Sequence, residues 1–113
     1  MKLIQAIVNT DRLDAIRDRL FELGAPGLTV DSVTGIGKPL GQMRYSETRG
    51  FVPRFFPNSR VQVVLEDDRV PEVVAAIQEV CRTGHFGDGK IFVIPVEEVV
   101  RIRTGETGKQ ALY

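Results

Sequence analysis

The sequence has little of what disulfide scaffolds, metal clusters and membrane proteins need. It contains one cysteine (Cys81), one histidine (His85) and no tryptophan. A lone cysteine excludes an internal disulfide and a cysteine metal cluster, and with one histidine a zinc site would need an unusual ligand set. No apolar run approaches the ~18 residues of a membrane-spanning helix, and the amino terminus lacks the shape of a signal peptide. We therefore expect a cytoplasmic protein without direct membrane insertion.

An excess of charge of one sign is also lacking. The 15 basic and 15 acidic residues cancel, so the formal net charge is zero at neutral pH. This balance gives no support to binding of nucleic acid or to adsorption on a membrane surface. The 113 residues, 42% of them hydrophobic, predict one domain over residues 1–113 that buries roughly two-thirds of its unfolded surface.

What is present is a βαβ unit that occurs twice. In the first half, Lys2–Val8 is rich in apolar and β-branched residues and predicts a strand. Apolar residues at spacings of three and four then predict a helix, with Thr10 or Asp11 as its N-cap and Gly24 just past its end. After a turn, residues 28–36 predict a second strand.

The second half repeats this order. Residues 60–65 predict a strand, and the apolar positions between Val70 and Cys81 predict a helix. Pro71 fits the first turn of that helix, where its missing N–H costs nothing, and Gly84 lies just past the end. Residues 91–96 predict the fourth strand.

Together the two units predict an α+β, ferredoxin-like fold of order βαββαβ. Its antiparallel sheet of four strands would carry both helices on one face. The predicted strands are apolar on both sides, as these residues show: Leu3, Ile7, Val30, Val61, Val63 and Phe92. A bare apolar sheet face on a small domain usually marks self-association, so we expect an oligomer.

A long segment, residues 38–59, joins the second and third strands without a helical or strand period. In a compact domain such a segment is typically functional or disordered. It carries aromatic residues beside arginines, which favours a partner-binding loop. The residues concerned are Arg44, Tyr45, Arg49, Phe51 and Arg54. The alternative is that Phe55 and Phe56 pack back into the core.

The most distinctive stretch follows the second helix. Residues 87–89, Gly-Asp-Gly, predict a tight loop whose amides can turn inward because two of its residues lack a Cβ. Lys90 comes next, and the alternation over residues 99–103 predicts a strand with Arg101 and Arg103 on one face. Loop amides, a lysine and two arginines suit a polyphosphate. The alternative is an ordinary turn and a solvated strand face.

Two motifs in the second half, with matching positions before them, have the spacing of a known family. The motifs are Thr83-Gly84-x-x-Gly87-Asp-Gly-Lys-Ile-Phe-Val93 and Arg101-Ile-Arg-Thr-Gly-Glu106. The matching positions are Met1, Lys2, Ala6, Ile7, Leu13, Asp14, Arg17, Gly24, Gly27, Thr29, Val30, Gly35, Gly37, Gly41 and Pro57. From the first residue to Glu106, with no insertion, the chain resembles the PII signalling proteins, trimeric regulators with a ferredoxin-like fold.

The resemblance implies a homotrimer whose three clefts between subunits bind ATP or ADP, with AMP as a further candidate. Mg²⁺ can accompany ATP. Loop 87–90 would line the cleft, two arginines would reach the phosphates from the adjacent subunit, and Lys38 stands where the family usually has arginine. The implied nucleotide-binding residues are Ile7, Thr29, Gly35, Gly37, Lys38, Val63, Val64, Gly87, Asp88, Gly89, Lys90, Arg101 and Arg103.

Four further positions depart from the family pattern. Pro39 replaces a glutamine that helps ligate the magnesium holding 2-oxoglutarate, and Asn58 replaces a lysine that pairs with its carboxylate. Both changes argue against binding of 2-oxoglutarate by this chain. Phe51 stands at the uridylylated tyrosine and Arg49 at the phosphorylated serine of other members. We predict a divergent regulator of energy or nitrogen/carbon status, whose target is a transporter or a metabolic enzyme.

Two other functions are compatible with the sequence. A small nucleotide hydrolase could orient water with Asp88 or Glu106, and a metal-binding trimer could use Cys81 and His85. Because no catalytic dyad can be assembled, we expect no catalytic residue, no metal site and at most a slow ATPase side activity. In the C-terminal segment, residues 104–113, the last seven residues are expected to be disordered or to fold over the nucleotide.

Overall fold

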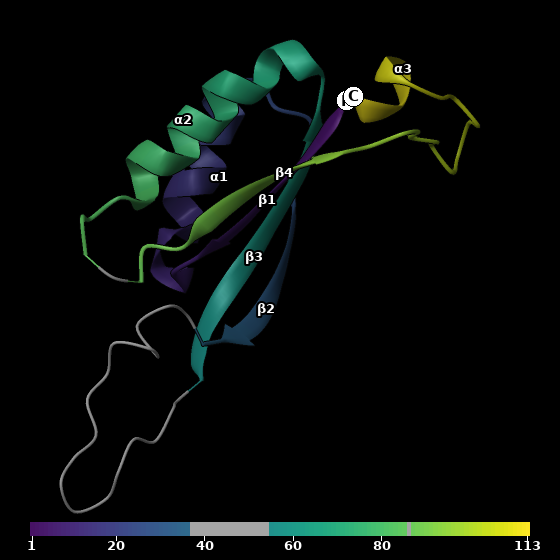
Figure 1. Cartoon of the computed structure of the whole chain (residues 1–113). Coiled ribbons are helices and arrows are strands. Elements are labelled where there is room, and N and C mark those ends of the chain that lie inside the picture. The colour runs from purple at the N-terminus through teal and green to yellow at the C-terminus, as the bar shows by residue number, and fades with distance from the viewer. Residues whose placement is uncertain (37–54, 86) are drawn as a thin grey trace, which may run out of the picture.

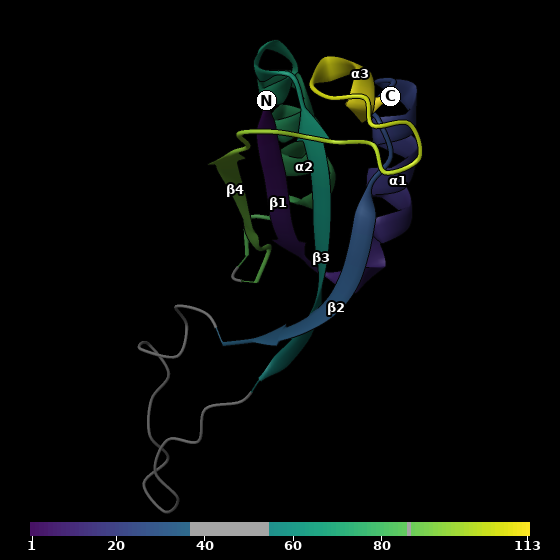
Figure 2. The same ribbon diagram turned by 90° about the vertical axis from the view of Figure 1, so that its right-hand side faces the viewer.

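The computed structural model, shown in Figure 1, describes residues 1–36, 55–85 and 87–113. Its strands are β1 (Lys2–Val8), β2 (Thr29–Gly35), β3 (Phe56–Leu65) and β4 (Lys90–Pro95), and its helices are α1 (Leu13–Glu22), α2 (Val70–Cys81) and α3 (Lys109–Leu112). The strands pair antiparallel in the order β2-β3-β1-β4. Figures 1 and 2 show α1 and α2 together on one face of this sheet. The predicted ferredoxin-like α+β fold is confirmed.

The core lies between the sheet and these two helices. Alternate residues of β1 and β3 point to the helices, because successive strand residues face opposite sides. The largest fully buried side chains are Ile4, Val8, Ile16, Leu20, Val61, Leu65, Val73 and Ile77. Burial of each contributes about 1.5–3 kcal/mol, which fixes how the sheet and helices meet. Among the described helices none combines the length and apolarity needed to cross a bilayer.

The face of the sheet away from the helices is part polar and part apolar. Arg60 on β3 makes two hydrogen bonds to Asp31 on β2, at 3.0 and 2.5 Å, and Gln62 bonds Gln5 at 3.1 Å. Apolar side chains concentrate on and beside β4, where Phe92 is 44% exposed. The prediction of two apolar faces is therefore correct only for part of this face.

The start of α1 differs from the prediction. Thr10 and Asp11 are not side-chain caps, because residues 10–12 form a short 3₁₀ turn before α1 begins at Leu13. The Thr10 hydroxyl is within hydrogen-bond distance, 2.9 Å, of the buried Ser59 hydroxyl instead. The predicted end of α1 is confirmed: Gly24 has a positive φ, and its N–H donates to the carbonyl of Phe21.

The third strand begins earlier than predicted. Residues 56–59, assigned to the long loop, belong to β3 and continue its pairing with β2 down to the pair Gly35–Phe56. Because β1 ends opposite Ser59, residues 56–58 pair on one side only, and there Pro57 needs no N–H on the open side. Phe55 and Phe56 are 70% and 53% exposed, so they do not pack into the core.

The predicted partner-binding residues lie outside the described residues. These are Arg44, Tyr45, Arg49, Phe51 and Arg54, all within residues 37–54.

The chain after β4 contradicts two further predictions. Residues 99–103 are not a strand: the N–H of Arg101 donates to the Glu106 carbonyl at 2.8 Å, and the N–H of Gly105 donates back to the Arg101 carbonyl. An alternating sequence forms a strand only where it finds a partner, and here the chain turns at Gly105 instead. The last residues are not disordered, because they form α3 and Tyr113 is hydrogen-bonded to the domain.

Candidate functional site

The loop between α2 and β4 is held together by one carboxylate. Asp88 accepts hydrogen bonds from the N–H groups of Thr83, at 2.7 Å, and Gly84, at 3.0 Å, and from the Thr83 hydroxyl. The bond from the Thr83 side chain, with the backbone bonds, holds the pKa of Asp88 below its usual range. Asp88 is therefore ionised at neutral pH, and its hydrogen bonds hold the start of the loop close to its end.

The two glycines flanking Asp88 let the loop backbone approach β1. Gly87 and Gly89 have φ of +94° and +102°. A Cβ at Gly89 would lie 1.8 Å from the carbonyl oxygen of Ile7, so only glycine fits. The side-chain amide of Asn9, which directly follows β1, donates to the Gly87 carbonyl at 3.1 Å. Sequence reasoning missed Asn9, for which only its position after a strand was a signal.

Lys90 begins β4 directly after this loop. Its register partner is Ile7, which pairs with Arg60 on its other side. Arg60 is bound to Asp31, and its side-chain hydrogen bond lowers the pKa of that carboxyl. Lys90 is exposed and forms no ion pair within the described part of the chain. Its positive charge is therefore available to a ligand beside the loop.

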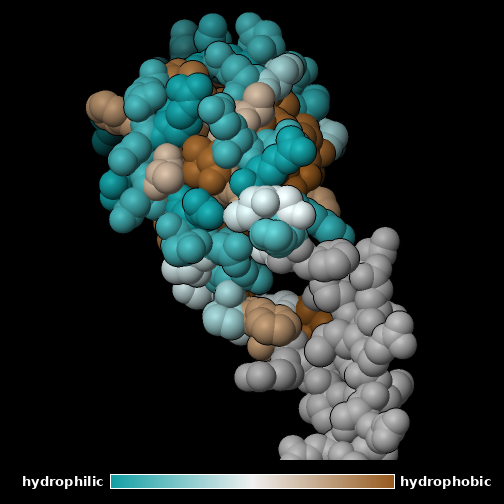
Figure 3. Space-filling model, turned by 90° about the vertical axis from the view of Figure 1, so that its left-hand side faces the viewer, coloured by the Kyte–Doolittle hydropathy of each residue, from teal (hydrophilic) through white to brown (hydrophobic). Residues whose placement is uncertain are grey.

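A hollow of about 650 Å³ lies on the helix side of the same loop. Its lining combines apolar side chains such as Val8 and Ile91 with cations such as Arg82. Cys81 and His85 both border it, but Cys81 is buried and burial raises the pKa of its thiol. Within the described ranges no group of three or more His, Cys, Asp or Glu could hold a metal ion. Figure 3 shows this side of the molecule as largely hydrophilic, with small hydrophobic patches.

The two predicted phosphate-binding arginines lie on the turn after β4, and the side chain of one of them is engaged. The Arg101 guanidinium donates to Glu106 Oε1 and to the Gln110 carbonyl, each at 3.0 Å. Arg103 is exposed. The predicted common strand face for these arginines is wrong, because the chain turns between them and Glu106.

The site residues fall into groups at opposite ends of the sheet. Ile7, Gly35 and residues 87–90 lie at the end where β1 finishes. Arg101 and Arg103 follow the far end of β4, roughly 17 Å away at about 3.3 Å per residue. Figure 1 shows the two segments apart, beyond either end of β4. One chain therefore does not bring them to a common ligand.

The remaining predicted residues are scattered or not described. Thr29 and Val64 lie on the sheet face away from the helices, as their register partners Gln62 and Leu3 do. Val63 is 3% exposed, so its side chain belongs to the core. Gly37 and Lys38 lie outside the described residues.

The carboxylates considered for hydrolysis both have structural partners. The Asp88 carboxylate accepts hydrogen bonds from Thr83 and Gly84. Glu106 Oε1 accepts from Arg101 at 3.0 Å and from the Thr104 hydroxyl at 2.8 Å. Neither carboxylate is placed beside His85 by a hydrogen bond in the described structure, so the geometry gives the hydrolase hypothesis no support.

Comparison with known proteins gives one consistent result. The family model of "Nitrogen regulatory protein P-II" matches residues 1–106. Relatives with that name are 45% identical in Azospirillum brasilense, 44% in Rhizobium meliloti and 40% in Rhodospirillum rubrum. Each similarity spans 112 residues, 99% of this chain and 100% of the relative. The resemblance read from the motifs is confirmed, and the chain belongs to the nitrogen regulatory protein P-II family.

Proposed function

We propose that this signal-transduction protein binds ATP or ADP between the subunits of a homotrimer and regulates a partner protein through the segment before β3, residues 38–55. The observation that carries the proposal is the separation of the cationic segments. Loop 83–90 with Lys90 lies at one end of the sheet, and Arg101 with Arg103 follows the other. A second copy is the simplest source of the missing half of each site.

The loop supplies a preorganised half-site. Its glycines hold the backbone in conformations that other residues avoid, and Asp88 and Asn9 fix it against β1. Such a loop loses little entropy when a phosphate binds. Lys90 then adds a compact positive charge, and arginines from a neighbouring copy add planar, bidentate donors.

This arrangement favours sensing over catalysis. A charge-assisted contact to the terminal phosphate contributes about 1.5–3 kcal/mol, which corresponds to roughly 10–100-fold discrimination between ATP and ADP. If the conformation of residues 38–55 depends on that phosphate, the nucleotide changes the surface that a partner meets. The partner we envisage is a transporter or a metabolic enzyme.

The structure around Asn58 supports energy sensing over 2-oxoglutarate sensing. Asn58 lies in β3 opposite Val33 and is half-buried. A neutral amide there gives the carboxylates of 2-oxoglutarate no charged partner. Mg²⁺ would accompany ATP as a ligand of its phosphates, a mode that this small cation prefers.

Calorimetric titration tests the proposal with ATP, ADP and AMP, each with and without Mg²⁺ and 2-oxoglutarate. Micromolar binding of ATP and ADP, unchanged by 2-oxoglutarate, is the expected result. Lys90→Ala should weaken it at least tenfold, whereas Lys2→Ala, a lysine paired with Asp67, should leave it unchanged. Absence of nucleotide binding would overturn the proposal, and ATP binding tightened by 2-oxoglutarate would overturn the energy-sensor assignment.

A further inference from the structure

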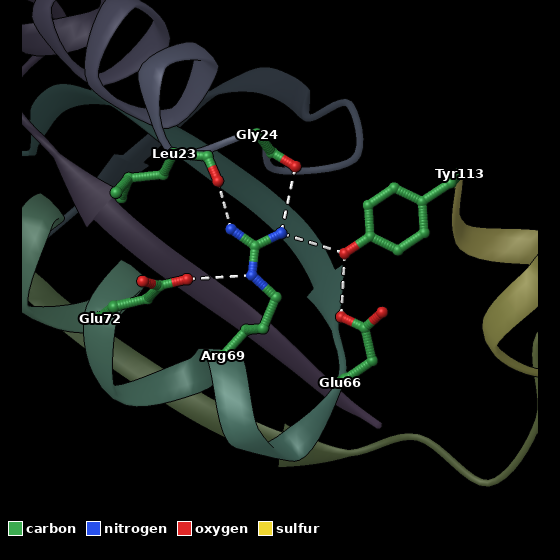
Figure 4. Close-up of polar contacts among 6 residues, drawn as sticks. All are labelled: Leu23, Gly24, Glu66, Arg69, Glu72 and Tyr113. Atoms are coloured by element: carbon green, nitrogen blue, oxygen red, sulfur yellow. Dashed lines mark hydrogen bonds and ion pairs between the residues drawn. The ribbon is translucent and has the colours of Figure 1, made fainter.

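The C-terminal segment is fastened to the helical layer by one phenol. Figure 4 shows the Arg69 guanidinium surrounded by four acceptors. It donates to the carbonyls of Leu23 and Gly24 at the end of α1, to Glu72 at 2.9 Å, and to the Tyr113 hydroxyl at 3.0 Å. The Tyr113 hydroxyl in turn donates to Glu66 at 2.9 Å. We call the contact of Tyr113 with Arg69 and Glu66 the Tyr113 latch.

The same segment holds Arg101. The Arg101 guanidinium binds the Glu106 carboxylate and the Gln110 carbonyl, each at 3.0 Å. Gln110 lies in α3, three residues before Tyr113, so the Arg101 contact and the Tyr113 latch hold the same short helix. The end of this short segment, Tyr113, is thus hydrogen-bonded to the rest of the domain, and Glu106 and Gln110 of the same segment are hydrogen-bonded to Arg101.

We propose that this segment is an internal competitor for Arg101, and that the Tyr113 latch sets its strength. The inference rests on the proposed function, in which Arg101 binds the phosphates of a nucleotide held by a neighbouring subunit. With the latch closed, Arg101 is bound within its own chain. A nucleotide phosphate must replace the Glu106 carboxylate and the Gln110 carbonyl before it can bind the Arg101 guanidinium.

The contacts are suited to exchange. A guanidinium offers a planar fork that fits a carboxylate and a phosphate equally well. The Arg101 and Glu106 side chains are 26% and 39% exposed, so their pairing is weakened by water. The competition is therefore modest. The coupling must also be reciprocal. If closing the latch lowers the affinity for the nucleotide by some factor, then binding of the nucleotide to Arg101 lowers the equilibrium constant for latch closure by the same factor.

The first arm of the test concerns the latch alone, without nucleotide. Tyr113→Phe removes only the hydroxyl and should lower the NMR order parameters of residues 109–112. Glu72→Gln is the matched control, since it changes another partner of Arg69 and leaves Tyr113 in place. Unchanged order in Tyr113→Phe would overturn the latch.

The second arm measures ADP affinity by calorimetry. Tyr113→Phe, which removes both hydrogen bonds of the hydroxyl, should tighten ADP binding by about three- to tenfold, or about 0.6–1.4 kcal/mol. Glu106→Gln should tighten it further, and Glu22→Gln, which removes the same charge from an exposed pair on α1, should change it less than twofold. Equal affinity of Tyr113→Phe and the unmodified protein would overturn the competition even if the segment is looser. If neither binds ADP, the proposed function and the competition both fail, while the order parameters still decide the latch.

Discussion

At the scale of single residues, the fit of Gly89 against β1 is the tightest constraint on the candidate site. The space that a Cβ would need is filled by the Ile7 carbonyl oxygen, 1.8 Å from its ideal position, and the φ of +102° disfavours any other residue. Because that oxygen belongs to the sheet, it cannot move aside as a flexible side chain could. The loop must shift instead.

Gly89→Ala should therefore destabilise the protein by about 2–4 kcal/mol, through backbone strain together with steric overlap. Gly87→Ala is the matched control: its φ is similarly positive, but apart from its two chain neighbours no atom of the described residues lies within 4 Å of the new Cβ. It should cost only about 1–2 kcal/mol. Urea unfolding monitored by circular dichroism gives both values. Equal losses would show that the close approach to Ile7 contributes nothing.

Asp88 makes a residue-scale prediction about pH. Its pKa is depressed by the bonds from Thr83 and Gly84, so its stabilisation is fully present above its unfolded pKa, about 3.9. That stabilisation is lost as the pH falls through the lower folded value. The difference in unfolding free energy between the unmodified protein and Asp88→Asn should be constant from pH 7 to about 5 and should shrink below about 4. A difference that does not change with pH would contradict this role.

At the scale of secondary-structure elements, Arg69 joins three helices. It is the N-cap residue of α2, binds the carbonyls of Leu23 and Gly24 just past the end of α1, and contacts Tyr113 after α3. Those carbonyls have no partner inside α1, and a cation at a helix C-terminus also favours the helix dipole. The alignment of the helical layer thus depends on one side chain that is three-quarters shielded from solvent.

Arg69→Ala should cost about 1.5–3 kcal/mol of stability, because it leaves partly shielded carbonyls without a donor. Arg19→Ala, in an exposed pair with Glu22 on α1, is the control and should cost less than about 1 kcal/mol. Differential scanning calorimetry measures both. Similar values for the two variants would mean that Arg69 is only another surface charge.

Elements with a clear period and clear ends were predictable from the sequence. The bounds of β1 match the prediction, and Pro71 lies in the first turn of α2 as expected. The segments predicted wrongly depend on distant partners. Residues 56–59 become strand because β2 lies beside them, whereas residues 99–103 pair with no strand of the described ranges and make only an isolated bridge between Val100 and Thr107. The helix α3 was not predictable either, because the contacts of Tyr113 are with Glu66 and Arg69, more than 40 residues away.

The same limit applies to the candidate site. Its motif and its glycines were visible in the sequence, but the contact of Gly89 with Ile7 and the bond from Asn9 follow only from the packing of the loop on β1. The hydrogen bond between Arg101 and Glu106 could not be predicted from the sequence either, because Glu106 was an equally good candidate for orienting a water molecule. The local chemistry of the site could be predicted, whereas these contacts between residues far apart in the sequence could not.

At the scale of the whole molecule, the account depends on how the two cationic segments meet. In a single chain they lie at opposite ends of β4, so we infer that each nucleotide site combines loop 83–90 of one subunit with Arg101 and Arg103 of the next. Lys90→Ala and Arg101→Ala should then each weaken nucleotide binding at least tenfold in a trimer made of one variant alone. The control is sedimentation velocity, which should show that both variants still assemble.

The most direct test is complementation between these two variants. When Lys90→Ala and Arg101→Ala subunits assemble at random, every mixed trimer has one intact site, so calorimetry should recover ATP binding at about one site in four. A matched assembly of Lys90→Ala with the double variant, Lys90→Ala plus Arg101→Ala, contains no intact site and should not bind. Recovery only in the first mixture is what the account predicts. No recovery there would contradict it, because a site built within one chain cannot be restored by mixing.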